Sequence, residues 1–583
     1  MPEAPEHLEP LLLPRPRHIE AVVAGISLRH TATIDAESRI APSGYRLRTS
    51  GTAYELVAAD DAGLRHGHAT LAQLRTQYGD AVPPLLIEDA PAIATRGVML
   101  DVSRDRIPTM TELDRVARSF SAMKLNHLQL YTEHTFAYAG YEEVWRDASP
   151  LTPDEVRLFD DTCRGLGIEL AANQNCFGHL AEWLRHDRYA PLAETHGTWD
   201  FYGVERSGPF SLCPTDPASL DLVADLLDQL MPCFGSTLVN IGCDETADVG
   251  QGRSRAAVER DGRATVYLAF VETIARLVTE RGGVPMFWAD VALSHPERVA
   301  DIPESLIPCA WGYEADSPFE DWARLLTEFG RTPWVSPGTS AWRSFTGRTS
   351  DRRANIRSAT DAAARHGARG LLMTEWGDLG HRQQWPVAMV AIAEAADAAW
   401  HGAGEGYDPR AASLHVFGDR SLRVASWLDA LGDADESVRA VYGPIDEHGQ
   451  PTRLKNATAL FEDLHPARPR DGMPVPEPGP WTDTRDRLAA LRSELPAVAD
   501  PRLASELEQT LAVAEFAAHH AITKRTGGIE EAGEAKRLID QLDAVVTGHR
   551  ALWSVTSRPN RLDASVAWYE RVREQLLRYR DAR

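Results

Sequence analysis

The chain has 583 residues, a formal net charge of −24 and a 43% share of hydrophobic residues. This length predicts two to four globular domains, and the acidic balance argues against nucleic acid or an anionic membrane as the main partner. Six cysteines without a C-x-x-C pair predict neither a zinc site nor a redox motif, and no metal or cofactor is expected. No run is long enough to span a membrane, and the apolar run at residues 11–13 is too short for a signal peptide, so a cytoplasmic location is expected.

Residues 1–93 form the first predicted unit. Residues 45–48 and 54–57 alternate polar and apolar side chains with a period of two, which is typical of antiparallel strands. Residues 63–77 have the pattern of one helix. A small α+β domain is therefore predicted ahead of the rest of the chain.

From residue 96 to about residue 400, short apolar runs alternate with amphipathic stretches of helical length. The helical stretches have recognisable ends: Thr152, Pro153 and Glu155 have the arrangement of a capping box, and glycines follow three of the others. Eight strand–helix repeats predict a (β/α)8 TIM barrel over residues 94–404. A doubly wound open sheet is the alternative, and it is disfavoured because no glycine-rich phosphate loop follows the first strand. The predicted strands are residues 97–100, 127–131, 168–172, 238–242, 285–288, 306–310, 333–335 and 370–373.

Residues 405–583 are rich in Ala, Leu, Glu and Arg and predict a C-terminal α-helical domain. Its expected role is packing against the barrel or formation of a homodimer. A proline-rich stretch at residues 466–480 predicts a linker or a long loop within it. The predicted helices are residues 413–431, 454–464, 482–495, 503–522, 531–548 and 564–580.

Two adjacent carboxylates, Asp244 and Glu245, follow the fourth predicted strand. An isolated Asp–Glu pair is most often a solvated surface pair. Barrel enzymes, however, carry their sites at the C-terminal ends of the strands, and two carboxylates aimed into one cleft have different pKa values. One proton donor beside one permanent anion suits acid-assisted cleavage of a glycosidic bond.

Four consecutive strand ends, from the fifth to the eighth, each deliver a tryptophan: Trp288, Trp311, Trp342 and Trp376. A single tryptophan is usually a core residue. Four at equivalent positions beside a carboxylate pair favour a pocket that packs aromatic faces on a pyranose ring. No His, Cys, Asp or Glu cluster has clear metal-ligand spacing, which disfavours metal-dependent hydrolysis.

Three segments, in this order, resemble the β-N-acetylhexosaminidases of glycoside hydrolase family 20. Residues 96–104, Arg-Gly-Val-Met-Leu-Asp-Val-Ser-Arg, resemble the family's first barrel strand. Gly178-His179 resembles its Pro-Gly-His motif after strand three, and residues 241–245, Ile-Gly-Cys-Asp-Glu, resemble its His-x-Gly-Gly-Asp-Glu signature. The resemblance covers residues 20–400 and implies a zincin-like α+β domain before the barrel.

The resemblance implies a retaining, substrate-assisted reaction on a terminal β-linked N-acetylhexosamine, in which the substrate's own 2-acetamido carbonyl attacks the anomeric carbon. Glu245 is then the general acid and base, and Asp244 orients the acetamido N–H. The other implied substrate contacts are Arg96 and Glu375 on ring hydroxyls, His179 with Glu133 as a polar relay behind Glu245, and Trp288, Trp311, Trp342 and Trp376 as pocket walls.

The departures from the family pattern are specific. Asn240 replaces the histidine of the signature, Cys243 replaces its second glycine, and the Asp-Asp-Gln-Gly-Trp loop after strand two is absent. These departures resemble the divergent, hexosaminidase-D-like branch. The tyrosine that donates to the acetamido oxygen in the family has no match. Two other hypotheses stay open: a retaining glycosidase of another barrel family that uses Glu245 and Glu375, and a sugar-binding barrel without turnover.

Overall fold

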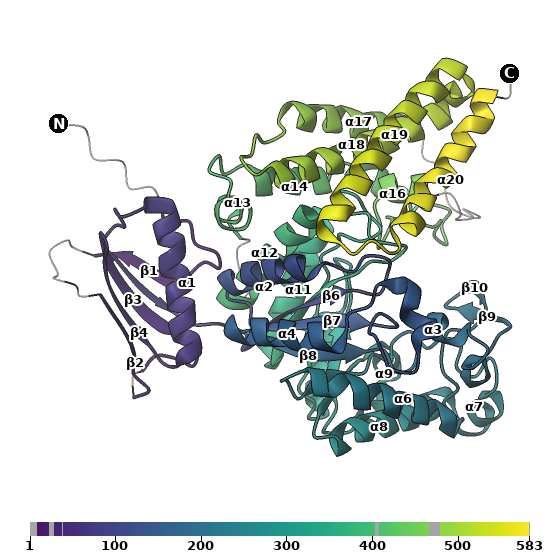
Figure 1. The fold of residues 1–583 in the computed structure, drawn as a ribbon, viewed down its shortest axis with the longest axis horizontal. Coiled ribbons are helices and arrows are strands. Elements are labelled where there is room, and N and C mark those ends of the chain that lie inside the picture. Colours follow the sequence, from purple (N-terminus) through teal and green to yellow (C-terminus); the bar gives the residue numbers. More distant parts are fainter. Residues whose placement is uncertain are drawn as a thin grey trace.

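Eight parallel strands close into a barrel at the centre of the molecule (Figure 1). The computed structural model describes residues 9–22, 28, 30–37, 39–402, 407–465 and 478–581. Each strand pairs with the next, and β15 closes the ring by pairing with β6. The predicted (β/α)8 barrel is confirmed, because an open sheet lacks this closure. The strands are β6 (Thr95–Asp101), β7 (His127–Thr132), β8 (Glu169–Gln174), β11 (Leu238–Asn240), β12 (Val284–Trp288), β13 (Ile307–Trp311), β14 (Trp334–Ser336) and β15 (Gly370–Glu375).

Three of the helices between these strands, α2, α4 and α6, begin at residues whose side chains cap the helix. The Thr109 side chain accepts a hydrogen bond from the N–H of Glu112 at the start of α2, and Thr152 and Glu155 form the capping box of α4. After the fifth strand, only the short α9 and a 3-10 turn are present. The helices are α2 (Met110–Ala122), α4 (Pro153–Gly165), α6 (Pro217–Leu230), α8 (Arg263–Glu280), α9 (Asp290–Leu293), α10 (Phe319–Glu328), α11 (Thr349–His366) and α12 (Trp385–His401).

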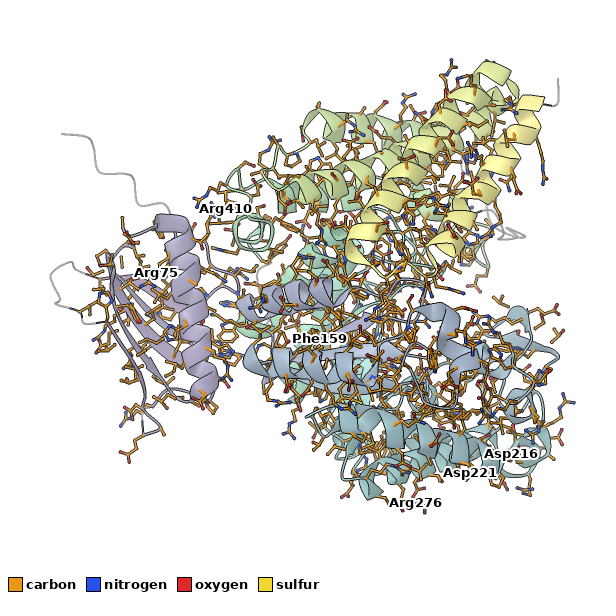
Figure 2. All side chains as sticks on the ribbon, in the orientation of Figure 1. Arg75, Phe159, Asp216, Asp221, Arg276 and Arg410 are labelled. Carbon is orange, nitrogen blue, oxygen red and sulfur yellow. The ribbon has the colours of Figure 1, made fainter. Side chains whose placement is uncertain are left out.

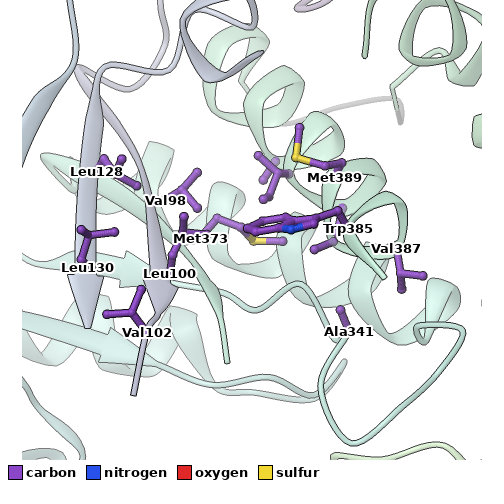
Figure 3. Packing of buried hydrophobic residues seen from close by; sticks show 14 of the residues in the cluster. Val98, Leu100, Val102, Leu128, Leu130, Ala341, Met373, Trp385, Val387 and Met389 are labelled. Carbon is purple, nitrogen blue, oxygen red and sulfur yellow. The ribbon is translucent and has the colours of Figure 1, made fainter. Parts of the chain in front are cut away.

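Alternate residues of the barrel strands face opposite sides. Val98 and Leu100 of β6 and Met373 of β15 face the helices and pack in one cluster with Trp385 and Met389 of α12 (Figure 3). The residues between them face the barrel axis and form a separate, aromatic-rich cluster. The barrel interior is therefore a packed core and not a channel. Members of this inner cluster include Met99, Tyr131, Met286, Trp288, Cys309, Trp334, Leu372 and Trp376.

The N-terminal part is a five-stranded sheet with the helix α1 (Asp61–Tyr78) on one face (Figure 1). It meets the barrel at the N-terminal ends of the barrel strands. There Asp89 accepts hydrogen bonds from the Tyr45 hydroxyl and from Nε1 of Trp400, each at 2.9 Å, and pairs with Nζ of Lys124 at 3.1 Å. These buried bonds close that end of the barrel. The strands, in sheet order, are β1 (His18–Ala21), β5 (Leu85–Asp89), β3 (Tyr45–Ser50), β4 (Ala53–Ala58) and β2 (Thr31–Ile34).

The C-terminal part is helical and lies over the barrel (Figure 1). Arg502 of this part pairs with Glu112 of α2 at 2.6 Å. The helix predicted over residues 413–431 is interrupted at Gly418, and the helix predicted over residues 454–464 begins only at its sixth residue, because Thr458 is its N-cap. Most of the predicted linker at residues 466–480 lies outside the described residues. The helices are α13 (Pro409–Phe417), α14 (Val424–Gly432), α15 (Glu436–Arg439), α16 (Ala459–Leu464), α17 (Pro478–Ser493), α18 (Pro501–Thr526), α19 (Ala532–Thr556) and α20 (Leu562–Asp581).

The outer helices present charged side chains to solvent, for example Asp221 of α6 and Arg276 of α8 (Figure 2). In the described part of the chain, no helix has both the length and the apolar composition that crossing a membrane requires. The long segment between β8 and α6 carries a two-stranded hairpin that the sequence analysis missed, β9 (Thr198–Phe201) and β10 (Val204–Ser207).

Candidate active site

A pocket opens at the C-terminal ends of the barrel strands. Its empty volume is about 420 Å³, including space that is open to solvent. Nearly all of its lining residues end or closely follow a barrel strand, and the one exception, Asn456, belongs to the C-terminal part. The lining residues are Arg104, His179, Asp244, Glu245, Trp288, Trp311, Tyr313, Trp376, Asp378 and Asn456.

A tight turn after β11 aims Asp244 and Glu245 into this pocket. Cys243 and Glu245 have φ angles of 72° and 52°, in the left-handed region. This conformation costs a non-glycine residue about 1 kcal/mol or more, so neighbouring bonds must hold it. The N–H of Cys243 donates to Oδ1 of Asn175 at 3.2 Å. The N–H of Glu245 donates to Oδ2 of Asp290 at 3.0 Å. The strained turn is thereby fixed from two neighbouring strands.

Asp244 is held as a buried anion. Its Oδ1 accepts a hydrogen bond from Nδ2 of Asn175 at 2.8 Å, and its Oδ2 lies 3.3 Å from Nε2 of His179. Burial acts to raise the pKa of Asp244, but the charge and hydrogen bond of His179 outweigh it and hold the pKa below its usual range. Burial likewise acts to lower the pKa of His179, and the charge of Asp244 overcomes it and raises that pKa to about 9. The two side chains therefore form an ion pair at neutral pH.

Glu245 has the opposite character. Its side chain is 32% exposed, and its Oε2 lies 3.5 Å from Nε2 of His179. Burial of the carboxyl raises the pKa of Glu245; His179 opposes this shift, and the like charges of Asp244 and Asp378 reinforce it. The pKa values of these adjacent carboxyls are thus shifted in opposite directions, downward for Asp244 and upward for Glu245.

Arg104 follows β6 and brings its guanidinium to the pocket. Its nitrogens lie 3.0 Å from Oδ2 of Asp101, 3.1 Å from Oε1 of Glu133 and 3.7 Å from Oδ1 of Asp378. Asp101 and Glu133 are buried, whereas Asp378 lines the pocket. The arginine is consequently held from behind by Asp101 and Glu133, and its guanidinium lines the pocket with Asp378.

His179 connects this arginine to the two carboxylates. Its Nδ1 lies 3.3 Å from Nη2 of Arg104 and 3.9 Å from Oε1 of Glu133. Because arginine only donates, the shorter contact is a hydrogen bond only when Nδ1 is unprotonated, and a protonated Nδ1 has Glu133 as its nearby acceptor. In both states the Nε2–H faces Asp244. Glu133 therefore lies behind His179, on the side away from the pocket.

Aromatic side chains form the other walls. Trp311 and Tyr313 stack with ring centroids 5.1 Å apart at 25°, and Nε1 of Trp311 donates to Oδ1 of Asp290 at 3.2 Å. Nε1 of Trp376 donates to the Tyr313 hydroxyl at 2.7 Å, and Trp376 contacts Trp288 with ring centroids 6.0 Å apart. Hydrogen bonds between the walls fix their orientation, so the pocket is preformed.

Arg96 does not reach the pocket, which corrects the prediction that it binds ring hydroxyls. It is 1% exposed and lies at the N-terminal end of β6, the opposite end of the barrel. Its guanidinium donates to the backbone carbonyl oxygens of Ile93, Ala94 and Lys124 at 2.8–2.9 Å. Burial lowers the pKa of Arg96 to about 9. Its role is to join the N-terminal sheet to the barrel.

Glu375 and Trp342 are also outside the pocket lining. Glu375 is 1% exposed and accepts hydrogen bonds from Oγ1 of Thr339 and, at 2.9 Å, from Nε2 of Gln383. Burial raises the pKa of Glu375 to about 7. Trp342 lies behind Tyr313, with ring centroids 4.9 Å apart at 84°. The prediction that Glu375 contacts a sugar hydroxyl is therefore wrong. The prediction that Trp342 forms a pocket wall is also wrong, because its ring packs behind Tyr313, which does line the pocket.

Four lining residues were absent from the predicted contacts: Arg104, Tyr313, Asp378 and Asn456. The first three stand within three residues of the ends of β6, β13 and β15, respectively. Because barrel enzymes carry their sites at the C-terminal ends of the strands, the sequence could have identified these three residues. Asn456 lies far beyond the last barrel strand, and nothing in the sequence around it signals a site.

Comparisons with known proteins agree with this geometry. No family model matches the chain. Hexosaminidase D of Bos taurus is 26% identical over 251 residues, which cover 41% of this chain and 69% of that protein. A beta-hexosaminidase of Akkermansia muciniphila is 25% identical over 284 residues, which cover 43% of this chain and 57% of that protein. The alignment spans little more than half of the second relative. Both alignments leave more than half of this chain unmatched.

Solved structures share the fold. A beta-N-acetylhexosaminidase superposes with a TM-score of 0.54 at 20% identity, over 67% of this chain and 90% of its own. The chitobiase of Flavobacterium johnsoniae superposes with a TM-score of 0.56 at 14% identity, over 97% of this chain and 99% of its own. The long superposition includes the C-terminal part, which the sequence alignments do not reach.

The closed barrel, the carboxylate pair in its pocket and these relatives define a glycoside hydrolase. Within that class, the resemblance to the β-N-acetylhexosaminidases of family 20, and to hexosaminidase D among them, is confirmed. Among the described residues, no group of three or more His, Cys, Asp or Glu side chains is arranged to hold a metal ion.

Proposed function

We propose that the chain is an exo-acting, retaining β-N-acetylhexosaminidase that hydrolyses terminal β-linked N-acetylglucosamine or N-acetylgalactosamine by substrate-assisted catalysis. The observation that carries this proposal is the contrast between Asp244 and Glu245 on one turn. One is an anion paired with His179, and the other is a carboxyl of raised pKa at the pocket mouth. Consecutive residues of one turn lie on the same side of a bound sugar. They therefore suit a reaction in which the substrate itself supplies the nucleophile.

In the first step, the acetamido carbonyl oxygen of the substrate attacks the anomeric carbon, and Glu245 protonates the departing glycosidic oxygen. Asp244 accepts a hydrogen bond from the acetamido N–H and stabilises the positive charge that spreads over the oxazolinium ring. The bond from Asn175 and the ion pair with His179 keep Asp244 ionised for this task.

In the second step, the carboxylate of Glu245 takes a proton from water, and the water oxygen attacks the anomeric carbon. The bond between that carbon and the acetamido oxygen breaks, which restores the acetamido group and retains the β-configuration. His179 lies within 3.5 Å of both carboxylates, so its charge favours the ionised form of Glu245 that this step requires.

The ring hydroxyls are assigned to Arg104 and Asp378, which face each other across 3.7 Å in the pocket. At this edge of the pocket, the Arg104 cation donates hydrogen bonds to ring hydroxyls, and the Asp378 anion accepts hydrogen bonds from adjacent ones. Trp288, Trp311 and Trp376 pack against the apolar faces of the sugar and of its acetamido methyl group. These assignments replace Arg96 and Glu375 of the sequence analysis.

A matched pair of substrates tests the proposal. An aryl β-N-acetylglucosaminide should be cleaved about a hundredfold faster or more than the aryl β-glucoside, because only the former carries an intramolecular nucleophile. Equal rates would instead favour the alternative glycosidase with a protein nucleophile, in which Asp378 would replace Glu375 as the partner of Glu245 because Glu375 does not line the pocket. No cleavage of either substrate, combined with binding of N-acetylglucosamine, would favour the sugar-binding barrel without turnover.

A further inference from the structure

Residues 453–458 of the C-terminal part lie against the loops that follow β13 and β14. The N–H of Asn456 donates to Oε1 of Glu314 at 2.7 Å, and the N–H of Thr458 donates to the carbonyl oxygen of Arg343 at 3.1 Å. Glu314 is itself fixed by Nη1 of the buried Arg348 at 3.0 Å. This segment is therefore tied to the rim of the pocket by the backbone N–H groups of Asn456 and Thr458.

The side-chain amide of Asn456 has a defined orientation. Its Oδ1 accepts a hydrogen bond from Nε1 of Trp342 at 2.9 Å. An indole N–H can only donate, so this contact assigns the oxygen, and the Nδ2 group lies on the other branch of the amide. In the described part of the chain, Nδ2 has no acceptor, and Asn456 lines the pocket beside Tyr313 and Asp378.

The pocket offers a bound sugar few side-chain donors, among them Arg104 and Nε1 of Trp288, which has no hydrogen-bond partner among the described residues. Asp244 and Asp378 accept when ionised, and Arg104 is engaged by three carboxylates. A sugar with an acetamido group presents several acceptor oxygens, and a buried oxygen without a donor loses binding free energy. The side-chain NH2 group of Asn456, at the pocket wall, is able to donate to such an oxygen.

We infer that the C-terminal part completes the sugar pocket, with Nδ2 of Asn456 donating a hydrogen bond to an oxygen of the bound N-acetylhexosamine. This inference rests on the proposed function for the identity of the sugar, and it gives the C-terminal helices a role in binding in addition to packing. Trp342 is then a positioning residue, because its indole N–H turns the Nδ2 group of Asn456 toward the ligand.

Two substitutions isolate the donor. Asn456 has a φ of 55°, a left-handed conformation that Asp and Gly tolerate. Asn456→Asp keeps an acceptor for Trp342 and replaces only the NH2 group with oxygen. Asn456→Gly removes the whole side chain without backbone strain. Lys455→Ala is the matched control, since Lys455 sits on the same segment, its exposed side chain pairs with Asp316 at 2.6 Å, and it does not line the pocket.

The full-length variants are compared by calorimetric titration with N-acetylglucosamine, by kcat and KM on an aryl β-N-acetylglucosaminide, and by thermal unfolding. Asn456→Asp should weaken sugar binding about tenfold or more and Asn456→Gly about fivefold to tenfold, with unfolding temperatures near that of the unaltered chain. Lys455→Ala should stay within about twofold, because exposed ion pairs contribute little.

Unchanged sugar affinity in a folded Asn456→Asp variant overturns the inference. So does an equal loss in Lys455→Ala, because that result assigns the effect to the position of the segment. If either Asn456 variant unfolds, the other decides by the same affinity criterion. Trp342→Phe supplies a third measurement, because it removes the bond that orients the amide together with part of the buried ring. Weakened sugar binding in a chain that cleaves no glycoside would reject the proposed hydrolysis and leave the inference standing.

Discussion

Arg96 and Arg104 stand at opposite ends of β6, and each is enclosed by an aromatic ring and acidic neighbours. The guanidinium of Arg96 lies 5.0 Å from the ring of Trp400, and it donates mainly to backbone carbonyl oxygens, with one longer contact of 3.5 Å to Nε2 of His66. The guanidinium of Arg104 lies 5.0 Å from the ring of Trp376, and it contacts three carboxylates and Nδ1 of His179. One end of the strand is satisfied by the chain itself, and the other keeps charges that face a cavity.

This comparison shows that burial and residue type do not distinguish structure from function in this barrel. What differs is where the polar groups find their partners. At the N-terminal end, the Asp89–Lys124 pair is sealed by Tyr45 and Trp400. At the C-terminal end, several polar groups share the same partners, and some of their hydrogen-bonding atoms stay available to a substrate.

The largest effect should come from the proton donor at the C-terminal end. Glu245→Gln should lower kcat about a thousandfold on a disaccharide, whose leaving group needs a proton. An activated aryl glycoside, whose leaving group departs as an anion, should lose much less. Steady-state kinetics on the two substrates measure the difference. Similar losses on both would mean that Glu245 does not act as the acid.

The second effect compares the two arginines directly. Arg104→Lys should lower kcat/KM of the folded enzyme about a hundredfold, because the ammonium group cannot span three carboxylates as the planar fork does, and it should also lower stability because the buried Asp101 and Glu133 lose part of their pairing. Arg96→Lys should leave kcat/KM of the folded enzyme unchanged and lower the free energy of unfolding by about 2–4 kcal/mol, since buried carbonyl oxygens lose their donors. Kinetics and urea unfolding of both variants provide the measurement. The comparison breaks if Arg96→Lys is the variant that loses activity while remaining folded.

The sequence was sufficient for the barrel because its evidence is repetitive. Each strand is a short apolar run, each helix has a cap or a terminal glycine, and eight repeats reinforce one another. The same regularity located Asp244, Glu245 and the three tryptophans that line the pocket, since each ends or follows a strand that could be recognised. It also offered two arginines on one strand, and only the direction of the strand distinguishes Arg104 from Arg96.

The remaining site residues depend on tertiary contacts that leave no local pattern. Trp342 follows the correct strand, but its loop turns the ring behind Tyr313. Asn456 fell within a predicted helix, whereas Thr458 caps the real helix and leaves Asn456 in a left-handed conformation at the pocket rim. The hydrogen bonds of this segment with the barrel loops outweigh its local helical propensity.

A smaller effect should separate the two carboxylates near the end of β15. Asp378→Asn should raise KM about tenfold, because the neutral amide is a weaker acceptor for a hydroxyl and a weaker partner for Arg104. The change in kcat should be less than the change in KM if Asp378 binds the sugar equally in the ground and transition states. A selective loss of kcat would instead indicate that Asp378 takes part in the chemistry.

The smallest effect on activity should come from Glu375, three residues earlier. Burial raises the pKa of this carboxyl from 4.5 to about 7, so between these pH values the folded state binds more protons than the unfolded state. Stability from this group is therefore present below pH 4.5 and is lost as pH rises through 7, with a total loss of about 3 kcal/mol.

Glu375→Gln should abolish this loss. The free energy of unfolding of the variant, relative to that of the unaltered chain, should therefore rise between pH 5 and pH 8, while kcat/KM stays within about twofold. Urea unfolding at the two pH values, together with kinetics, checks both parts. A large fall in kcat/KM would return Glu375 to the site, and it would then have to act through Gln383 and Trp376, because its own carboxyl does not line the pocket.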